Sequence, residues 1–135
     1  MSKSKFWIPL TYAPKISGVL AGTIRQTIRM KRLYKTGDKI AFHGWAGVPY
    51  RSPWSFRTPY LLLREVVPIL VFPEGISSMV SPGWSPRQMF WPYHRLDNLA
   101  AQDGIVPATG AELGRVLTGY HKIPEAGVEA QILRW

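Results

Sequence analysis

The sequence predicts an α+β fold with a mostly antiparallel sheet, in the order β-α-β-β-loop-β-α-α-β. Short runs of β-branched and aromatic residues, separated by Pro and Gly, are typical of strands. Three other segments carry the start and stop signals of helices. With 135 residues, 46% of them hydrophobic and 19% charged, the chain can bury a core, and we expect residues 1–135 to form a single domain.

The first part of the chain predicts a strand followed by a short helix. Residues 6–12, FWIPLTY, combine aromatic and β-branched side chains, which favour a strand. Residues 13–22 favour a helix, because Pro14 suits a first helical position and Gly22 suits a C-terminal stop. We expect one face of this helix to carry its larger apolar side chains, Ile16, Val19 and Leu20.

Residues 26–31 predict a second strand, although the letters TIR occur twice, four residues apart, as they would in a helical repeat. Alternation places Ile28 and Met30 on one face of this strand. The opposite face carries Thr27, Arg29 and Lys31. A turn at residues 35–38 then leads into a third strand at residues 39–45.

The middle of the chain predicts two irregular segments on either side of extended chain. Residues 46–60 and 73–95 are rich in Pro and aromatic side chains and predict loops that elaborate the domain. Residues 61–72 predict a pair of strands or one bent strand. Pro68 indicates a bulge or a sheet edge within them, because proline lacks the N–H that a central strand requires.

The last third of the chain predicts two helices and a final strand. Residues 96–104 favour a short helix that ends at a glycine. Residues 109–120 favour a longer helix, because Thr109 and Glu112 have the spacing of a capping box. Residues 127–135 predict the last strand.

The charge of the chain lies almost entirely in its first half. Net charge is +9, and residues 1–60 hold eleven Lys and Arg against one acid, whereas residues 61–135 hold six against seven. Such an asymmetry points to a polyanionic partner, most often nucleic acid. A basic protein whose charge serves only solubility is the alternative.

The densest run of positive charge follows the predicted first helix. Five cations and no acid occur within eleven residues: Arg25, Arg29, Lys31, Arg32 and Lys35. Arginine offers a planar fork of donors that matches a phosphate group, so we interpret this run as a phosphate-binding surface. A solvated sheet face is the alternative interpretation.

Both predicted loops interleave aromatic and basic side chains, an arrangement that suits unpaired bases. The first loop contributes Tyr50, Arg51, Trp54, Phe56 and Arg57. The second contributes Trp84, Arg87, Phe90, Trp91, Tyr93, His94 and Arg95. Alternatively, these rings pack the loops onto the core, or Trp84 and Trp91 belong to a protein-interaction surface.

Several classes of site find no support in the sequence. There is no Cys, which excludes disulfides and Cys-based zinc sites. His43, His94 and His121 lack the spacing of metal ligands, and no phosphate-loop motif occurs, so we expect no metal and no cofactor. No apolar run is long enough to cross a membrane, and Pro9 comes too early for a signal-peptide core, so we expect a cytoplasmic protein without a membrane partner.

Motifs in both halves of the chain resemble those of the ASCH domain of the PUA-like superfamily. The family pattern G-[RK]-K-T-x-T-I-R, followed by G-D, resembles AGTIRQTIR with Gly22, Thr27, Ile28 and Arg29 in register, and then Gly37-Asp38. LAAQDGI resembles the family's L-A-x-x-[ED]-G-F helix, and ILRW its last strand. The resemblance covers about residues 6–135, and residues 46–95 match least.

This resemblance implies a PUA-like β-barrel with flanking helices and a cleft between the TIR strand and the DG helix. Members of the family are thought to bind RNA or nucleotides, and some have been reported as ribonucleases. Short stand-alone members are common in phage and prophage genomes, so the resemblance also implies such an origin.

One branch of the family hydrolyses the acetyl amide of acetylated cytidine with a Lys, a Thr and a Glu. The Thr falls on Thr27 and the Glu on Asp103, so these are the candidate catalytic residues if the chain is an enzyme. The Lys falls on Ile24, which has no basic nitrogen, and the neighbouring Arg25 stays protonated and cannot act as a base. We therefore expect the catalytic lysine to be missing.

Taken together, these observations predict a module that binds RNA, single-stranded nucleic acid or a nucleotide, with a modified base as one ligand of interest. We expect Thr27, Arg29 and Asp103 to line the cleft. The predicted nucleic-acid contacts are Arg25, Arg29, Lys31, Arg32, Lys35, Arg51, Trp54 and Arg57. An amidohydrolase of acetylated cytidine, a ribonuclease and a protein-interaction module are the alternatives.

Overall fold

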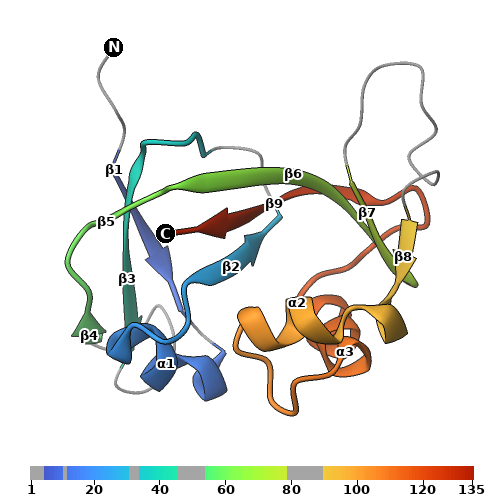
Figure 1. Ribbon diagram of the computed structural model, residues 1–135, viewed down its shortest axis with the longest axis horizontal. Helices are drawn as coiled ribbons and strands as arrows, with labels where there is room; N and C mark the ends of the chain where they lie inside the picture. The colour runs from blue at the N-terminus through green and yellow to red at the C-terminus, as the bar shows by residue number, and fades with distance from the viewer. Residues whose placement is uncertain (1–4, 11, 31–33, 46–53, 79–89) are drawn as a thin grey trace.

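The structure, a computed structural model, describes residues 5–10, 12–30, 34–45, 54–78 and 90–135. In this part of the chain nine strands form two sheets (Figure 1). The first sheet contains β1 (Lys5–Pro9), β3 (Lys39–Trp45), β4 (Trp54–Arg57) and β5 (Leu61–Leu62). The second, in spatial order, contains β2 (Gln26–Arg29), β9 (Val128–Arg134), β6 (Glu65–Phe72), β7 (Gly75–Ser78) and β8 (Phe90–Pro92).

The predicted α+β fold with mostly antiparallel sheets is confirmed. Strands β1 and β3 are the exception, because they pair in parallel from Lys5 opposite Lys39 to Pro9 opposite His43. A parallel pair needs a crossover connection, and this one runs through the first helix and β2. Within the described residues the strands do not close into a barrel.

Two hydrophobic clusters share strand β9, which lies between β2 and β6. One cluster lies between the four-stranded sheet and helix α1 (Ile16–Ala21), and includes Phe42 and Leu133. The other packs the five-stranded sheet against helices α2 (Asp97–Gln102) and α3 (Gly110–Tyr120), and includes Ile132. Neighbouring side chains of a strand point to opposite faces, so β9 contributes to both clusters and connects them.

The predicted helices are present, with ends close to those expected. A short 3₁₀ helix, η1 (Ala13–Lys15), precedes α1, which ends at Gly22 with a φ of 80°. In α3, the Thr109 side chain accepts a hydrogen bond from the Glu112 N–H, as the capping-box spacing predicted. Of the apolar residues expected on one face of α1, Val19 is buried, whereas Leu20 is 51% exposed.

Helix α3 presents two glycines, Gly110 and Gly114, where it contacts the short helix η2 (Tyr93–Arg95). A Cβ on Gly110 would collide with the Tyr93 carbonyl oxygen, and a Cβ on Gly114 would lie 2.6 Å from the Tyr93 ring. The Tyr93 hydroxyl donates a hydrogen bond of 2.8 Å to the carbonyl of Phe72, which ties η2 to β6. The two glycines therefore allow the helix to close against the sheet.

The two predicted loops contain strands, so the expectation that they are wholly irregular is wrong. Within residues 46–60, strand β4 pairs with β3, and within residues 73–95, β7 and β8 extend the second sheet. Pairing with distant strands supplies order that local sequence does not show. Pro68 fits the prediction, because within the described residues β7 pairs with β6 only from Ile69 onward, which leaves one side of Pro68 at a local edge in this part of the chain.

Candidate functional site

Three chemically reactive side chains meet where α1, β2 and α2 come together. The Lys15 Nζ lies 3.1 Å from Thr27 Oγ1 and 3.4 Å from Asp103 Oδ2. Each of the three residues is at most 5% exposed. Gly104, with a φ of 77°, follows Asp103, and a Cβ there would lie 2.7 Å from the Lys15 Cβ. We call Lys15, Thr27 and Asp103 the buried cluster.

A chain of hydrogen bonds connects the buried cluster to the surface. The Gln26 Nε2 donates to Asp103 Oδ1 and to the Leu99 carbonyl, both at 3.4 Å. The Gln26 Oε1 accepts a 3.0 Å bond from Arg134 Nε, and Arg134 in turn pairs with Glu65 at 2.6 Å. Gln26 is therefore the link between the cluster and the half-buried Arg134.

Burial disfavours both charges of the Lys15–Asp103 pair. Desolvation lowers the pKa of Lys15, and Arg29 lowers it further, whereas Asp103 opposes both effects. Desolvation raises the pKa of Asp103, against the opposing effects of Lys15 and Gln26. The two pKa values therefore move toward each other, and Lys15 gives up its proton more readily than an exposed lysine does.

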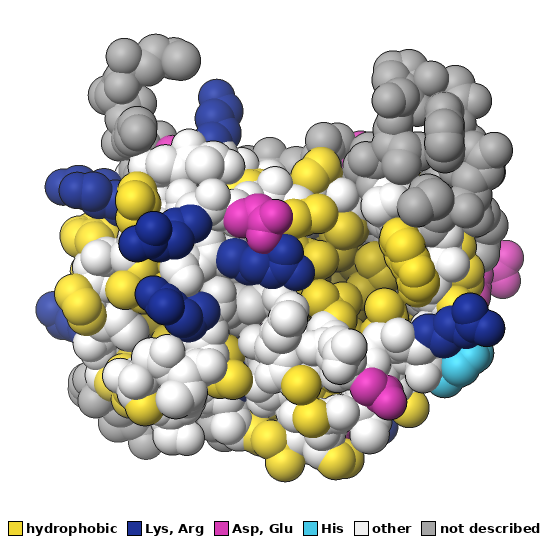
Figure 2. All heavy atoms as spheres, in the orientation of Figure 1, with side chains coloured by type: hydrophobic (Ala, Val, Ile, Leu, Met, Phe, Trp, Pro, Cys, Tyr) yellow, Lys and Arg dark blue, Asp and Glu magenta, His cyan; other side chains and the backbone are white. Residues whose placement is uncertain are grey.

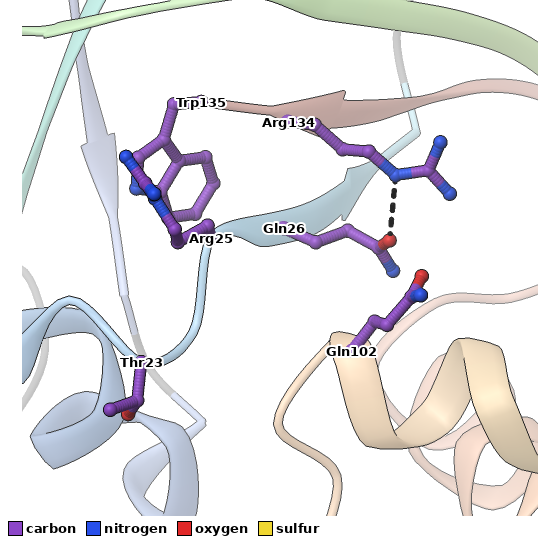
Figure 3. A pocket seen from close by; sticks show the side chains of 6 residues that line it. All are labelled: Thr23, Arg25, Gln26, Gln102, Arg134 and Trp135. Atoms are coloured by element: carbon purple, nitrogen blue, oxygen red, sulfur yellow. Dashed lines mark hydrogen bonds between the residues drawn. The ribbon is translucent and has the colours of Figure 1, made fainter.

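A pocket of about 510 Å³ opens beside the buried cluster (Figure 3). Its lining comes from the start of β2, the end of β9 and the last turn of α2: Thr23, Arg25, Gln26, Gln102, Arg134 and Trp135. Figure 3 shows the Gln26 and Gln102 side chains approaching each other from β2 and α2. The members of the buried cluster do not line this pocket, but Gln26, which does line it, donates a hydrogen bond to Asp103 of the cluster.

The pocket combines positive charge, amide groups and one large ring. Arg25 and Arg134 are cations, and the exposed Gln102 amide offers a donor and an acceptor, whereas the Gln26 amide is already bonded to Asp103, Leu99 and Arg134. The Trp135 ring is held in place, because it packs on Phe42 at a centroid distance of 4.9 Å. Such a lining can hold an anionic group next to a flat, polar ring.

The predicted site residues separate into several environments. Thr27 and Asp103 come together, and Arg25 lines the pocket. Arg29 does not line this pocket, because its guanidinium turns to the other side and donates a 3.0 Å bond to the Pro9 carbonyl. Lys35 is exposed in the turn before β3.

The remaining predicted contacts lie away from the pocket or outside the described residues. Arg57 is exposed on β4, opposite His43 in β3. Trp91 is 38% exposed on β8. The residues outside the described part of the chain are Lys31, Arg32, Arg51 and Trp84. For Trp54 the structure describes the strand but not the side chain.

The expectation that no lysine accompanies Thr27 and Asp103 is wrong. Position 24 is indeed Ile, and its side chain packs with the cluster around α1, but Lys15 reaches the same two residues from the preceding helix. No spacing rule connects position 15 to position 27, so pattern reasoning missed this residue. It also missed the pocket residues Gln102, Arg134 and Trp135, which come from the far end of the chain.

Comparisons with protein-family models, curated proteins and solved structures gave no match for this chain. No helix among the described residues has the length and apolar character to span a bilayer. Across the same residues, no three His, Cys, Asp or Glu side chains gather in a way that could hold a metal ion.

Proposed function

We propose that the protein binds a nucleotide unit, free or within single-stranded RNA, in the pocket beside the buried cluster. The observation that carries this proposal is the pocket lining, in which two guanidinium groups, two amides and an indole converge from three elements. Guanidinium groups bind phosphate, and amide groups read the polar edge of a base. The Trp135 indole borders the pocket but the residue is only 7% exposed, so it contributes a small apolar contact and not an open stacking face.

The position of the pocket also supports a PUA-like arrangement of this α+β fold. It lies between β2, which carries the TIR letters, and the end of α2, which carries the DG letters. This is where the resemblance to the ASCH family implies a cleft.

The first test is the binding of a fluorescent single-stranded RNA and of a nucleoside monophosphate at increasing salt. Affinity for RNA should fall steeply, because phosphate contacts release counterions. Arg25→Ala should weaken binding of both ligands roughly tenfold, the loss of one charge-assisted hydrogen bond. Arg95→Ala is the matched control, because Arg95 is exposed on η2 and does not line the pocket. Equal effects of the two variants would contradict the proposal.

A second candidate function, hydrolysis of an amide on a modified cytidine, is favoured by the position of Lys15. In its neutral form Lys15 can take the Thr27 hydroxyl proton as Oγ1 attacks the acyl carbon. The C–N bond then breaks, and the leaving nitrogen receives that proton from Lys15. Water hydrolyses the threonine ester and releases the acid. Binding ranks first because Thr27 is 2% exposed and does not line the pocket.

The test for hydrolysis is incubation with acetylated cytidine and detection of cytidine. Thr27→Val should abolish turnover, because it removes the hydroxyl and keeps the shape. Lys15→Arg should abolish it as well, because arginine keeps the charge but cannot act as a base. Absence of cytidine with the unmodified protein, under conditions in which it binds the nucleoside, would exclude this candidate.

A further inference from the structure

A second exposed surface lies on the outer face of the four-stranded sheet, away from the hydrophobic cluster. In β1, Phe6 and Ile8 pack with that cluster, so the alternate residues Lys5 and Trp7 face outward. Five exposed residues define this outer sheet face: Lys5, Trp7, Lys39, Tyr60 and Leu62. None of them lines the pocket.

Two aromatic rings on the outer sheet face lie next to each other and are partly exposed, and the Trp7 ring also contacts His43. Trp7 and Tyr60 are each 42% exposed, and their ring centroids are 5.4 Å apart at an angle of 52°. Lys5 Nζ lies 5.3 Å from the Tyr60 ring centroid, which is a cation–π distance. Large rings at a protein surface are candidates for contact with a partner.

Two like charges lie opposite each other on this face, an arrangement that lowers the stability of the sheet. Lys5 and Lys39 are direct register partners in the parallel pair of β1 and β3. Like charges directly opposite each other destabilise a sheet. All eight acidic residues of the chain lie outside the four strands of this sheet, so no carboxylate within it offsets the repulsion.

Positive charge extends beyond these two lysines. Arg57 is exposed on β4, in the same sheet. Figure 2 shows that, on the face in view, Lys and Arg side chains gather over the half of the molecule that holds β1, β3 and β5, with hydrophobic side chains among them. The exposed cations of this sheet, Lys5, Lys39 and Arg57, are complementary to a polyanion.

We propose that the outer sheet face is a second contact surface, on which single-stranded RNA stacks bases against Trp7 and Tyr60 while Lys5 and Lys39 contact its phosphates. This proposal rests on the proposed function, because it gives the same ligand, single-stranded RNA, a second binding surface outside the pocket. A single strand is favoured over a duplex because only unpaired bases expose the faces that stack on aromatic rings.

The experiment measures binding of a fluorescent single-stranded RNA of about 12 nucleotides, and of a nucleoside monophosphate, to the full chain. Trp7→Ala should weaken RNA binding about tenfold, the effect of losing one stacked base. Trp91→Ala is the matched control, because it removes a similarly exposed Trp from the other sheet. Neither variant should alter binding of the monophosphate, which needs only the pocket.

A second variant keeps the proposal testable if Trp7→Ala does not fold. The double change Lys5→Gln and Lys39→Gln alters only exposed side chains, and should reduce the slope of log affinity against log salt by about 1.4. A double change in which RNA affinity and its salt slope stay the same would overturn the proposal. Equal effects of Trp7→Ala and Trp91→Ala on RNA binding would also overturn it. The same holds if Trp7→Ala weakens binding to vesicles of anionic phospholipid but leaves RNA binding unchanged.

These readouts separate the failure of this proposal from that of the pocket. If the monophosphate does not bind while RNA binding depends on Trp7, the pocket proposal fails and the outer sheet face is supported. If the monophosphate binds with Arg25 dependence while RNA binding ignores Trp7 and the two lysines, the outer sheet face is overturned and the pocket is supported.

Discussion

The lysines of the buried cluster and of the outer sheet face all come from the basic first half of the chain, but their surroundings differ. Lys15 is enclosed and bonded to Thr27 and Asp103. Lys5 and Lys39 are exposed, and they face each other across two strands. The first charge is compensated within the protein, whereas on the outer face no acid of the sheet compensates the pair.

Burial therefore determines which cations of the protein are available to bind an anion from solution. A buried ammonium group needs partners within the fold, because leaving it unpaired would cost several kcal/mol. An exposed lysine is solvated and can exchange water for phosphate at little cost. Net charge alone therefore does not locate a binding surface, and the two environments can be separated by substitution.

The largest expected effect comes from breaking the buried cluster. Asp103→Ala should lower the free energy of unfolding by about 3–5 kcal/mol, because it leaves the Lys15 charge buried without its carboxylate. Urea denaturation measures this change. Glu125→Ala, at an exposed acid, is the control and should have little effect. The double change Lys15→Met with Asp103→Leu should cost less than Asp103→Ala alone, and a larger loss would contradict a charge pair.

A smaller effect of opposite sign is expected on the outer sheet face. Lys39→Glu places a carboxylate opposite Lys5 and should raise the free energy of unfolding by about 0.2–1 kcal/mol. The same variant should bind single-stranded RNA more weakly. Lys122→Glu is the control for a change of net charge elsewhere. A loss of stability in Lys39→Glu beyond that of the control would show that repulsion between the two lysines is unimportant.

The smallest effect concerns His43, which lies in the same sheet. Burial lowers its pKa below the ordinary value of 6.5, and Arg57 lowers it further. The unfolded chain therefore takes up the proton at higher pH than the folded protein does. The stability contributed by neutral His43 is present above about pH 6.5 and is lost as pH falls through 6.5 toward the folded pKa.

His43→Gln should accordingly flatten the decline in unfolding free energy between neutral and mildly acidic pH. Urea denaturation at a series of pH values measures it, with His94→Gln, at an exposed histidine, as the control. A decline that is the same in His43→Gln and in the unmodified protein would rule out this role for His43.

Local sequence signals predicted most of the fold. Gly22 ends α1, the Thr109 cap begins α3, and Pro68 marks a local edge in β6, since each of these features depends on the backbone chemistry of a few adjacent residues. Strands β4, β7 and β8 were missed because their pairing partners lie elsewhere in the sequence, and short Pro-rich segments carry little periodic signal.

The candidate site was only partly predictable, for a similar reason. The family-like motifs drew attention to Thr27 and Asp103, and the run of cations to Arg25. Lys15 meets Asp103 across 88 positions, and Gln26 meets Arg134 across 108. Such pairs are created by the packing of α1, β2, α2 and β9, so composition and spacing do not reveal them.

The glycines of α3 carry a consequence for the interpretation of mutational screens. Gly110 and Gly114 admit no side chain, because Tyr93 occupies that space. In a library of all single substitutions, we expect variants at Gly110 to be depleted as strongly as variants at Lys15. Depletion of Gly110 variants would reflect a failure to assemble α3 against η2. Protein abundance must therefore be measured before depletion of variants at any position is attributed to lost ligand recognition.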